Sequence, residues 1–367
     1  MSYIRKRVLE SGKTRYYPVL SRDGKELSLG GYSSRRDAKA ALQHADSEVA
    51  NGTFQRRNPR FSDFYTEWIA AKAAALKGTT RVSYEHTFRN HILPYFGGLH
   101  LDDIDPDQVQ RWVVEMQGKG LAPATVRRAY RYLTSCVNVA VERGYMDNPF
   151  RSIILPRQER KEVDCLKMEE LGYLADAAPE PYDCLFKLLA YTGARVGEAL
   201  ALRWRNVSFK DNAILIIASW SPDGGFTEPK SKAGRRAVPM MATLRAALLE
   251  YYGRQGEPDP DALLFPGKAP GKPLHFSSVS RAWHAARKVA RLREVSPHSA
   301  RHTFATTLIG QGASIKAVQV ALGHSTVTLT LNVYGHLLES DLAGALERAD
   351  LFIQGVESGQ VVRLKAG

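Results

Sequence analysis

The sequence predicts an α+β protein of several domains: a small sheet-plus-helix domain, an all-α domain, and a mainly α domain with a small antiparallel sheet. At 367 residues the chain is too long for one ordinary hydrophobic core. Strand-like runs fill the first thirty residues, helical apolar spacing dominates the rest, and residues 151–162 interrupt it with proline and charge. The predicted ranges are 1–54, a linker at 55–60, 61–152, 160–350 and a C-terminal tail at 351–367.

Positive charge is concentrated near the N-terminus. The formal net charge is +13 and the sequence pI is about 9.6, a balance that favours a polyanionic partner, most commonly nucleic acid. Residues 1–60 hold 13 Lys or Arg against 6 Asp or Glu, which is more than half of the excess. By itself such a cluster is explained equally well as a solvated basic tail.

The first 54 residues predict a three-stranded sheet and one helix. Runs of β-branched and aromatic residues are separated by Ser11-Gly12 and by Asp23-Gly24, and Asp-Gly is a strong hairpin signal. Ser33 or Ser34 can cap the following helix, which ends before Gly52. This helix can cover one face of the sheet, so the other face would present basic residues able to enter a DNA groove. The candidate DNA contacts are Arg5, Arg7, Lys13 and Arg15.

Residues 61–152 predict an all-helical domain. Four stretches have apolar residues at helical spacing, and the second contains Val82, Phe88 and Ile92 and is stopped by Pro94. The aromatic stripes on these helices are expected to form the core. Three arginines of the last helix lie partly away from its stripe, where they meet either DNA phosphates or only water. They are Arg127, Arg128 and Arg131.

No pattern in the sequence indicates a metal, a disulfide or a membrane span. Cys136, Cys165 and Cys184 have neither paired spacing nor nearby clustered histidines, which predicts reduced core residues. No apolar run is long enough to span a bilayer, and the first ten residues lack the apolar stretch of a signal peptide. We therefore expect a cytoplasmic protein that uses no metal or other cofactor.

Two fragments of the last domain supply cationic groups next to a carboxylate or at a loop tip. In YTGARVGEAL, Arg195 begins a helix and Glu198 lies three residues later on the same face. Alone, such a pair is usually structural. In the hairpin around EPKSKAGRRAVPM, Lys230 and Lys232 lie at the tip between two strands, where most lysines are simply solvated.

A third fragment, SPHSARHTFAT, predicts an anion-binding helix end. Ser296 is a good cap and Pro297 suits the first helical position. His298 and Arg301 then project from one face near the positive end of the helix. His302 would point elsewhere, and we expect it to be a buried packing histidine.

The fourth fragment, LGHSTVTLTLNVYGH, adds a histidine and a tyrosine. His324 follows a glycine-bounded turn, and Tyr334 follows ten residues later on a short apolar helical pattern. A single tyrosine there would normally belong to the core. Together, however, the four fragments offer two arginines, two histidines, a lysine and a tyrosine, which are the groups that a metal-free attack on a phosphodiester needs.

The four fragments resemble the tyrosine recombinases of the phage integrase type. That family has an arginine in a TGxRxxE segment, a hairpin lysine, an HxxRH segment, an LGH segment and a downstream tyrosine, and all occur here in that order over about residues 60–345. The first fifty residues look like the arm-site-binding domain of phage integrases, and the helical domain like their core-DNA-binding domain. The resemblance implies the catalytic set Arg195, Lys230 or Lys232, His298, Arg301, His324 and Tyr334, supported by Glu198. Lys230 is favoured because Pro229-Lys230-Ser231 looks more like the family's usual lysine context.

The resemblance also implies a mechanism. Tyr334, whose free pKa would be near 10, attacks a DNA phosphate held by Arg195 and Arg301 and forms a 3′-phosphotyrosine bond, which another 5′-hydroxyl reseals without ATP or metal. Guanidinium groups suit this task because they offer paired donors and stay charged. Among the histidines, His298 is the favoured manager of the tyrosine proton. The hairpin lysine would protonate the leaving 5′-hydroxyl.

The partners implied by the family are double-stranded DNA attachment sites and three further copies of this chain in a tetramer on DNA, in the nucleoid. A directionality factor and a host DNA-bending protein are further candidates, and residues 346–367 could be exchanged between neighbouring copies. Two rival functions are a type IB topoisomerase, which rejoins the same strand, and a non-catalytic DNA-binding protein of the same fold. The two-part DNA-binding region favours recombination, and the retained tyrosine and arginines favour catalysis.

Overall fold

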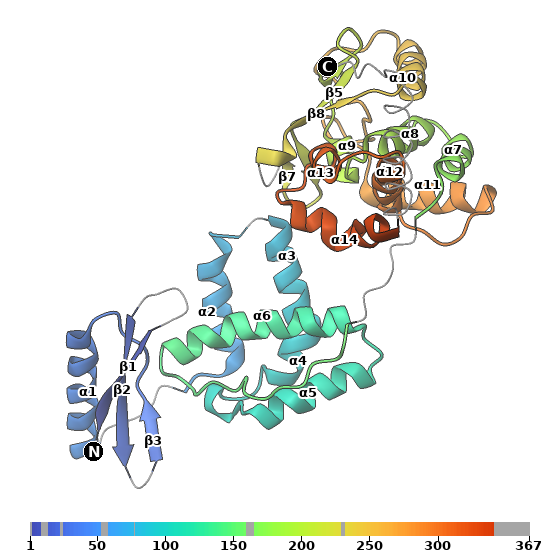
Figure 1. The fold of residues 1–367 in the computed structure, drawn as a ribbon. Coiled ribbons are helices and arrows are strands. Elements are labelled where there is room, and N and C mark those ends of the chain that lie inside the picture. The colour runs from blue at the N-terminus through green and yellow to red at the C-terminus, as the bar shows by residue number, and fades with distance from the viewer. Residues whose placement is uncertain are drawn as a thin grey trace, which may run out of the picture. The chain divides into compact units, whose positions relative to one another are not determined.

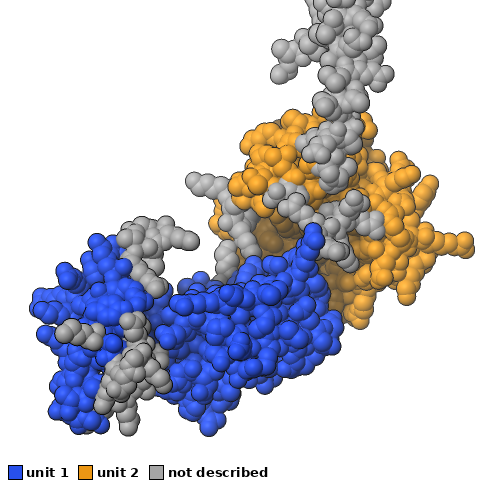
Figure 2. All heavy atoms as spheres, turned by 60° about the horizontal axis from the view of Figure 1, so that its bottom comes forward, with its two compact units in different colours: residues 1–160 blue, residues 161–367 orange. Residues whose placement is uncertain are grey.

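The computed structural model describes residues 2–8, 14–22, 25–52, 58–76, 78–158, 165–228 and 232–340. The chain divides into two compact units, residues 1–160 and 161–367, which are coloured separately in Figure 2. The chain is rich in α-helix and has small antiparallel sheets, as predicted. Among the sequence predictions, Lys13, Lys230, residues 55–57 of the linker and everything beyond residue 340, including the tail at 351–367, lie outside the described residues. The side chains of Arg7 and Lys232 are likewise outside the described part.

The first unit begins with the predicted sheet and helix. Strands β1 (Tyr3–Val8), β2 (Thr14–Arg22) and β3 (Lys25–Ser28) are antiparallel in that order, and α1 (Arg35–Ala50) packs along the sheet (Figure 1). The side chain of Ser34 accepts a hydrogen bond from the backbone N–H of Asp37, which fixes the start of α1.

The sheet meets the end of the last helix of this unit through backbone atoms. Gly31 N–H donates to the carbonyl oxygen of Glu142 at 2.8 Å. A Cβ at Gly144, whose φ is +77°, would lie 2.5 Å from the carbonyl carbon of Leu29, so only glycine fits there. The residues that follow the sheet therefore contact the end of this helix directly, although the expected linker at 55–60 separates the two in the sequence.

The rest of the first unit is helical around an aromatic core. Its elements are α2 (Phe61–Ala73), α3 (Gly78–Thr87), a π-helical turn (Phe88–Ile92), α4 (Leu93–Phe96), a short 3₁₀ turn (Leu101–Asp103), α5 (Pro106–Gly118) and α6 (Pro123–Glu142). Phe61, Phe64, Phe88 and Trp112 are at most 1% exposed. The predicted aromatic core is therefore present.

The second helical stretch of this unit differs from its prediction. Pro94 does not stop a helix but lies in the first turn of α4, where a missing N–H costs nothing. Val82 lies six residues before Phe88, which is about 240° around a regular α-helix, so the two side chains are on different faces. Phe88 is fully buried, whereas Val82 is 42% exposed and does not belong to the core.

The second unit packs helices around α8, which contacts α7, α10 and α12. Its helices are α7 (Met168–Asp176), α8 (Tyr182–Thr192), α9 (Val196–Leu200), α10 (Ala242–Arg254), α11 (Phe276–Val289), α12 (Ser299–Gly310), α13 (Ile315–Leu322) and α14 (Val327–Ser340). A 3₁₀ turn (Trp204–Asn206) follows α9. Strands β4 (Val207–Ser208), β5 (Ala213–Ile216) and β8 (Arg236–Pro239) form an antiparallel sheet in the order β4-β5-β8.

The predicted hairpin that carries Lys230 and Lys232 is a connection between two different sheets. Strand β7 (Gly225–Thr227) pairs with β6 (Ser219–Ser221), whereas β8 pairs with β5. The sequence signal that the prediction missed is Asp223-Gly224, which closes the short β6–β7 hairpin. Lys232 begins a 3₁₀ turn, Lys232–Gly234, just before β8.

Candidate active site

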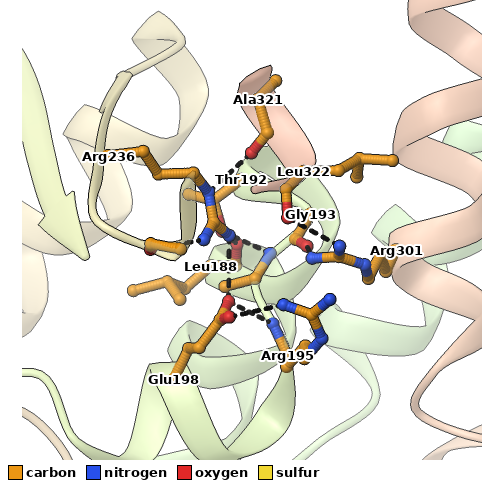
Figure 3. A network of polar contacts seen from close by, with 11 residues as sticks. Leu188, Thr192, Gly193, Arg195, Glu198, Arg236, Arg301, Ala321 and Leu322 are labelled. Carbon is orange, nitrogen blue, oxygen red and sulfur yellow. Dashed lines mark hydrogen bonds and ion pairs between the residues drawn. The ribbon is translucent and has the colours of Figure 1, made fainter. Parts of the chain in front are cut away.

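Two glycine-ended helices bring distant segments of the second unit together. Helix α8 ends at Gly193, with φ +61°, and α13 ends at Gly323, with φ +66°, both in the left-handed region that favours glycine. Arg195 follows the first turn and His324 the second. Figure 3 shows how the side chains of Arg195, Glu198, Arg236 and Arg301 meet around the backbone of these two turns.

Arg195 and Glu198 form the predicted pair. Arg195 Nη1 donates to Glu198 Oε1 at 2.8 Å, and the backbone N–H of Arg195 donates to Glu198 Oε2 at 3.0 Å. The side chain of Arg195 is 45% exposed, whereas that of Glu198 is 5% exposed. The carboxylate therefore holds the arginine from the protein side, while part of the guanidinium faces solvent.

Arg236 is a member of this network that the sequence analysis missed. Its guanidinium donates from Nη2 to Glu198 Oε2 at 2.9 Å and from Nε to the carbonyl oxygen of Ala321 at 2.7 Å. It also donates to the carbonyl oxygen of Gly234 at 3.2 Å. Strand alternation could have revealed it, because Arg236 lies two residues before the buried Val238 and hence on the same face of β8.

The carboxyl group of Glu198 stays ionised in spite of its burial. Burial acts to raise its pKa, but the charge and hydrogen bond of Arg236, followed by the contacts of Arg195, outweigh that effect and hold the pKa below its usual value. Glu198 is thus suited to orient two arginines and unsuited to act as a proton donor at neutral pH.

Arg301 lies deeper than Arg195. It is 3% exposed, and its guanidinium donates from Nη1 to the carbonyl oxygen of Gly193 at 2.7 Å and from Nη2 to that of Leu322 at 2.6 Å. Burial, then the charge of Arg195, lowers its pKa, and the group remains a cation at neutral pH. One side chain thus ties the turn before Arg195 to the turn before His324.

The helix that carries Arg301 starts later than predicted. Helix α12 begins at Ser299 with His298 at its N-cap, and Ser296 accepts from the Ser299 N–H through its backbone oxygen at 2.9 Å. Ser296 therefore belongs to a turn before the helix and is not its cap. His298 is exposed, and desolvation of its ring by the surrounding protein, followed by the charges of Arg301 and Arg195, lowers its pKa.

His324 is held by groups on both sides of its turn. Its Nδ1 lies 2.9 Å from the hydroxyl of Thr330, and its carbonyl oxygen accepts from Gln319 Nε2 at 2.9 Å. Burial, then the charges of Arg301 and Arg195, lowers its pKa to about 4. At neutral pH the ring is therefore uncharged.

Tyr334 lies in this cluster on α14, and its hydroxyl contacts a residue to which the sequence analysis gave no role. The tyrosine is 2% exposed, and its Oη lies 2.7 Å from Nδ1 of His302. The expectation that His302 points elsewhere and only packs is therefore wrong. The signal was missed because the contact joins α12 to α14 across 32 positions of sequence. Burial raises the pKa of Tyr334, and Arg301 opposes that rise.

The basic residues predicted to contact DNA differ in how freely they are available. Arg15 donates to the carbonyl oxygen of Gly31 at 2.9 Å, and Arg127 to that of Pro156 at 2.8 Å, so both also brace the backbone. Arg128 buries its Nε without a hydrogen-bond partner. Among the predicted contacts whose side chains the structure describes, Arg5 and Arg131 are exposed, and Arg5 also donates to the hydroxyl of Tyr3.

The strand register groups the N-terminal positions on one side of the sheet. Arg5 pairs with Tyr17 and Arg7 pairs with Arg15, so these four positions belong to the same face.

In the part of the chain that the structure describes, no three His, Cys, Asp or Glu side chains could hold a metal ion. None of the described helices is both long and apolar enough to cross a membrane.

This cluster of arginines, histidines and a tyrosine is a candidate site for attack on a phosphodiester, and comparisons with known proteins identify the family. The phage integrase family model matches residues 164–341, and the model of the phage integrase N-terminal SAM-like domain matches residues 60–117. The chain therefore belongs to the tyrosine recombinases of the phage integrase family, which are site-specific DNA recombinases.

Two relatives illustrate the match along the chain. A putative prophage phiRv2 integrase of Mycobacterium tuberculosis is 28% identical over 319 residues, which cover 83% of this chain and 84% of that protein. A tyrosine recombinase XerC-like protein of Caldanaerobacter subterraneus is 26% identical over 386 residues, covering 94% of this chain and 98% of the relative.

Solved structures share the fold. The Tn1549 transposon integrase in complex with a circular intermediate DNA aligns with a TM-score of 0.64 and 23% identity, over 78% of this chain and 98% of that chain. A lambda integrase dimer bound to a COC′ core site aligns with a TM-score of 0.62 and 18% identity, over 89% of this chain and 93% of that one.

Proposed function

We propose that this recombinase integrates or excises a mobile DNA element, with Tyr334 as the nucleophile. The observation that carries the proposal is the 2.7 Å contact of the Tyr334 hydroxyl with His302, on the helix that also carries Arg301 and lies far from Tyr334 in sequence. Tyr334 Oη attacks the scissile phosphorus, the bond from phosphorus to the 5′-oxygen breaks, and a 3′-phosphotyrosine bond joins protein to DNA. Prophage and transposon integrases among the similar proteins support this class of DNA substrate.

In this proposal, the two arginines neutralise the phosphate from different depths. Arg195 offers the exposed part of its guanidinium to a DNA phosphate, while Glu198 holds the other side. Arg301 supplies its charge from the interior, where a low dielectric strengthens it. Together they stabilise the added charge of the pentacoordinate transition state. His298 and His324 add hydrogen bonds to its oxygens.

The acid that protonates the leaving 5′-oxygen is a lysine of the β7–β8 connection. We propose Lys230, with Lys232 as the alternative. Arg236 begins the strand that follows these lysines, and it donates to Glu198 and to the carbonyl oxygen of Ala321. Because Glu198 also binds Arg195, this strand is linked to that arginine. Alanine substitution of each lysine separately, followed by a cleavage assay, tests the choice; a defect confined to the Lys232 variant contradicts it.

The remaining parts of the chain would bind DNA and assemble the enzyme on it. Residues 1–54 would contact arm sites and residues 61–152 core sites, with Arg5 and Arg131 the best-exposed candidates. A lambda integrase tetramer bound to a Holliday junction shares the fold, which supports a tetramer of this chain on two attachment sites. The enzyme would then work in the nucleoid, where those sites are.

A covalent trapping experiment tests the proposal. The substrate is a duplex that carries the repeated sequence at the ends of the surrounding DNA element, nicked so that the 5′-hydroxyl fragment diffuses away after cleavage. The wild-type chain should form a protease-sensitive adduct, and Tyr334→Phe should not. Tyr251→Phe is the matched control, because Tyr251 is also buried in this unit and donates its hydroxyl to the carbonyl oxygen of Leu264.

The outcomes separate the rival functions. Adduct formation with exchange of strands between two duplexes supports a recombinase. Cleavage that only reseals the same strand indicates a topoisomerase-like activity, and the absence of any adduct contradicts the proposal.

A further inference from the structure

The histidine that contacts the nucleophile has no role in the function proposed above. His302 Nδ1 lies 2.7 Å from Tyr334 Oη, well within hydrogen-bond distance. The ring centroids are 5.8 Å apart and the planes are inclined by 58°. The contact is therefore a directed hydrogen bond and not a stacked pair.

We infer that His302 is the group that accepts the phenolic proton of Tyr334 when the tyrosine attacks DNA. The inference rests on the proposed function of Tyr334. The direction of this hydrogen bond depends on the imidazole tautomer: in the tautomer that carries its proton on Nε2, His302 Nδ1 accepts from the Tyr334 O–H, and this is the tautomer that the inference assigns. In this arrangement an unprotonated ring nitrogen lies within hydrogen-bond distance of the Tyr334 oxygen, which is the atom that attacks.

The reaction balances as a transfer between named atoms. The O–H bond of Tyr334 breaks and its proton moves to His302 Nδ1. The electron pair left on Oη forms the bond to phosphorus. The bond from phosphorus to the 5′-oxygen breaks with its electron pair on that oxygen, which takes a proton from the ammonium group of the β7–β8 lysine. In the reverse step each proton returns along the same path.

His298, which the sequence favoured for this task, occupies a different position. It lies one helical turn before His302, and the two rings meet edge to face with centroids 4.7 Å apart. The hydroxyl contact is made by His302. His298, at the start of α12 near Arg301, then remains available to donate a hydrogen bond to the phosphate.

The charges around His302 make its basicity depend on DNA. Burial, then His298 and Arg301 on its own helix, lowers the pKa of His302 to about 4, while the neutral Tyr334 faces it from α14. The ring is consequently uncharged and able to accept near neutral pH. Burial and the charge of Arg301 oppose protonation of this imidazole in the free protein. A bound phosphate diester adds negative charge beside Arg301, which offsets that opposition at the moment of attack.

Two variants of His302 test the inference in the trapping assay. His302→Gln keeps a hydrogen-bond acceptor of similar size but cannot take a proton, and His302→Ala leaves space for added imidazole. His284→Gln, a partly buried histidine of α11 in the same unit, is the matched control and should react at the wild-type rate. Thermal unfolding and binding of the nicked duplex show whether each variant is folded.

We expect adduct formation to slow by about 10²-fold or more in both His302 variants, the usual range for loss of a general base. Imidazole should restore part of the rate to His302→Ala. A substrate with sulfur in place of the bridging 5′-oxygen needs no acid, because a thiolate leaves unprotonated. It should rescue a variant of the catalytic lysine and leave both His302 defects in place.

Other results overturn the inference. A wild-type rate in His302→Gln means that His302 only positions the hydroxyl, and a faster rate in His302→Ala means that it holds the tyrosine back. Rescue of His302→Ala by the sulfur substrate also contradicts a role in removing the phenolic proton. These results leave Tyr334 as the nucleophile intact, whereas the absence of an adduct with the wild-type chain contradicts the proposed function itself.

Discussion

The two units of this recombinase bury different kinds of side chain. In the described part of residues 1–160, Thr87 is the one polar residue in the buried set, and the rest of that interior is apolar and includes six aromatic side chains. In the described part of residues 161–367, the buried set includes Glu198, Arg236 and Arg301. A buried charge is costly unless it is paired and hydrogen-bonded. The second unit therefore carries that cost at the place where its chemistry would occur.

This difference shows which interactions each unit depends on. The aromatic interior gains stability from area and packing, which are tolerant of moderate changes in shape. The charged interior depends on a few pairs with fixed partners, such as Arg236 with Glu198 at 2.9 Å. Losing Arg236 leaves the buried charge of Glu198 compensated only by Arg195, which is partly exposed.

Arg236→Met should have the largest effect. It leaves Glu198 with a single cation and removes the hydrogen bond to the carbonyl oxygen of Ala321. We expect the second unit to lose about 3–5 kcal/mol of stability, measured by hydrogen exchange resolved by peptide. The neighbouring Arg235 pairs with Glu228 at the surface, so Arg235→Met should cost less than about 1 kcal/mol. Equal losses in the two variants would contradict the comparison.

Phe88→Ala tests the apolar interior in the same way. Phe88 is fully buried and stacks on Tyr65 with ring centroids 4.2 Å apart. Its truncation should destabilise the first unit by about 3–5 kcal/mol. Val82→Ala, at a position that is 42% exposed, should change stability by less than about 0.5 kcal/mol. A large loss in the Val82 variant would restore the uninterrupted helical pattern that the sequence suggested.

Acid should weaken the charged interior in two ranges of pH. The folded pKa of His302 is about 4 against an ordinary 6.5, so its contribution is complete above pH 6.5 and is lost as the pH falls toward 4. The folded pKa of Glu198 is below its ordinary 4.5, so its contribution is complete above that value and is lost at still lower pH. In Glu198→Gln, thermal unfolding of the second unit should depend less on pH below 4.5. An unchanged dependence would show that Glu198 is not held ionised.

Arg131→Ala should have the smallest effect, because this side chain is exposed on α6. If Arg131 contacts a phosphate, DNA affinity falls a few-fold and the slope of log affinity against log salt drops in magnitude by about one. A titration of duplex binding at several salt concentrations measures both. Arg111→Ala, an exposed arginine of α5, is the control for a general loss of charge. A slope unchanged by Arg131→Ala assigns that residue to the solvent.

Local patterns in the sequence predicted the elements and much of the site. The pair Arg195 and Glu198 is three residues apart on one helical turn, so its spacing was sufficient. The start of α1 at Ser34 and the aromatic core near Phe61 also follow from local chemistry and spacing. Such features need no knowledge of how distant segments pack.

Local sequence patterns could not predict contacts between segments that are far apart in the chain. His302 and Tyr334 are joined by the packing of α12 against α14, and no local spacing encodes that packing. Arg236 was readable in part, since strand alternation puts it on the buried face, but its partners Glu198 and Ala321 lie on other elements. The π-helical turn at Phe88–Ile92 likewise has no simple sequence signal.

The bonds from Arg301 to the carbonyl oxygens of Gly193 and Leu322 have a consequence for divergence. Every residue has a backbone carbonyl oxygen, so the acceptors that hold Arg301 do not depend on which side chains stand at these positions. If Arg301 holds the DNA phosphate as proposed, neighbouring side chains can change along with the target sequence while Arg301 keeps its position. Backbone acceptors of this kind allow the DNA sequence preference to change while the position of Arg301 stays the same.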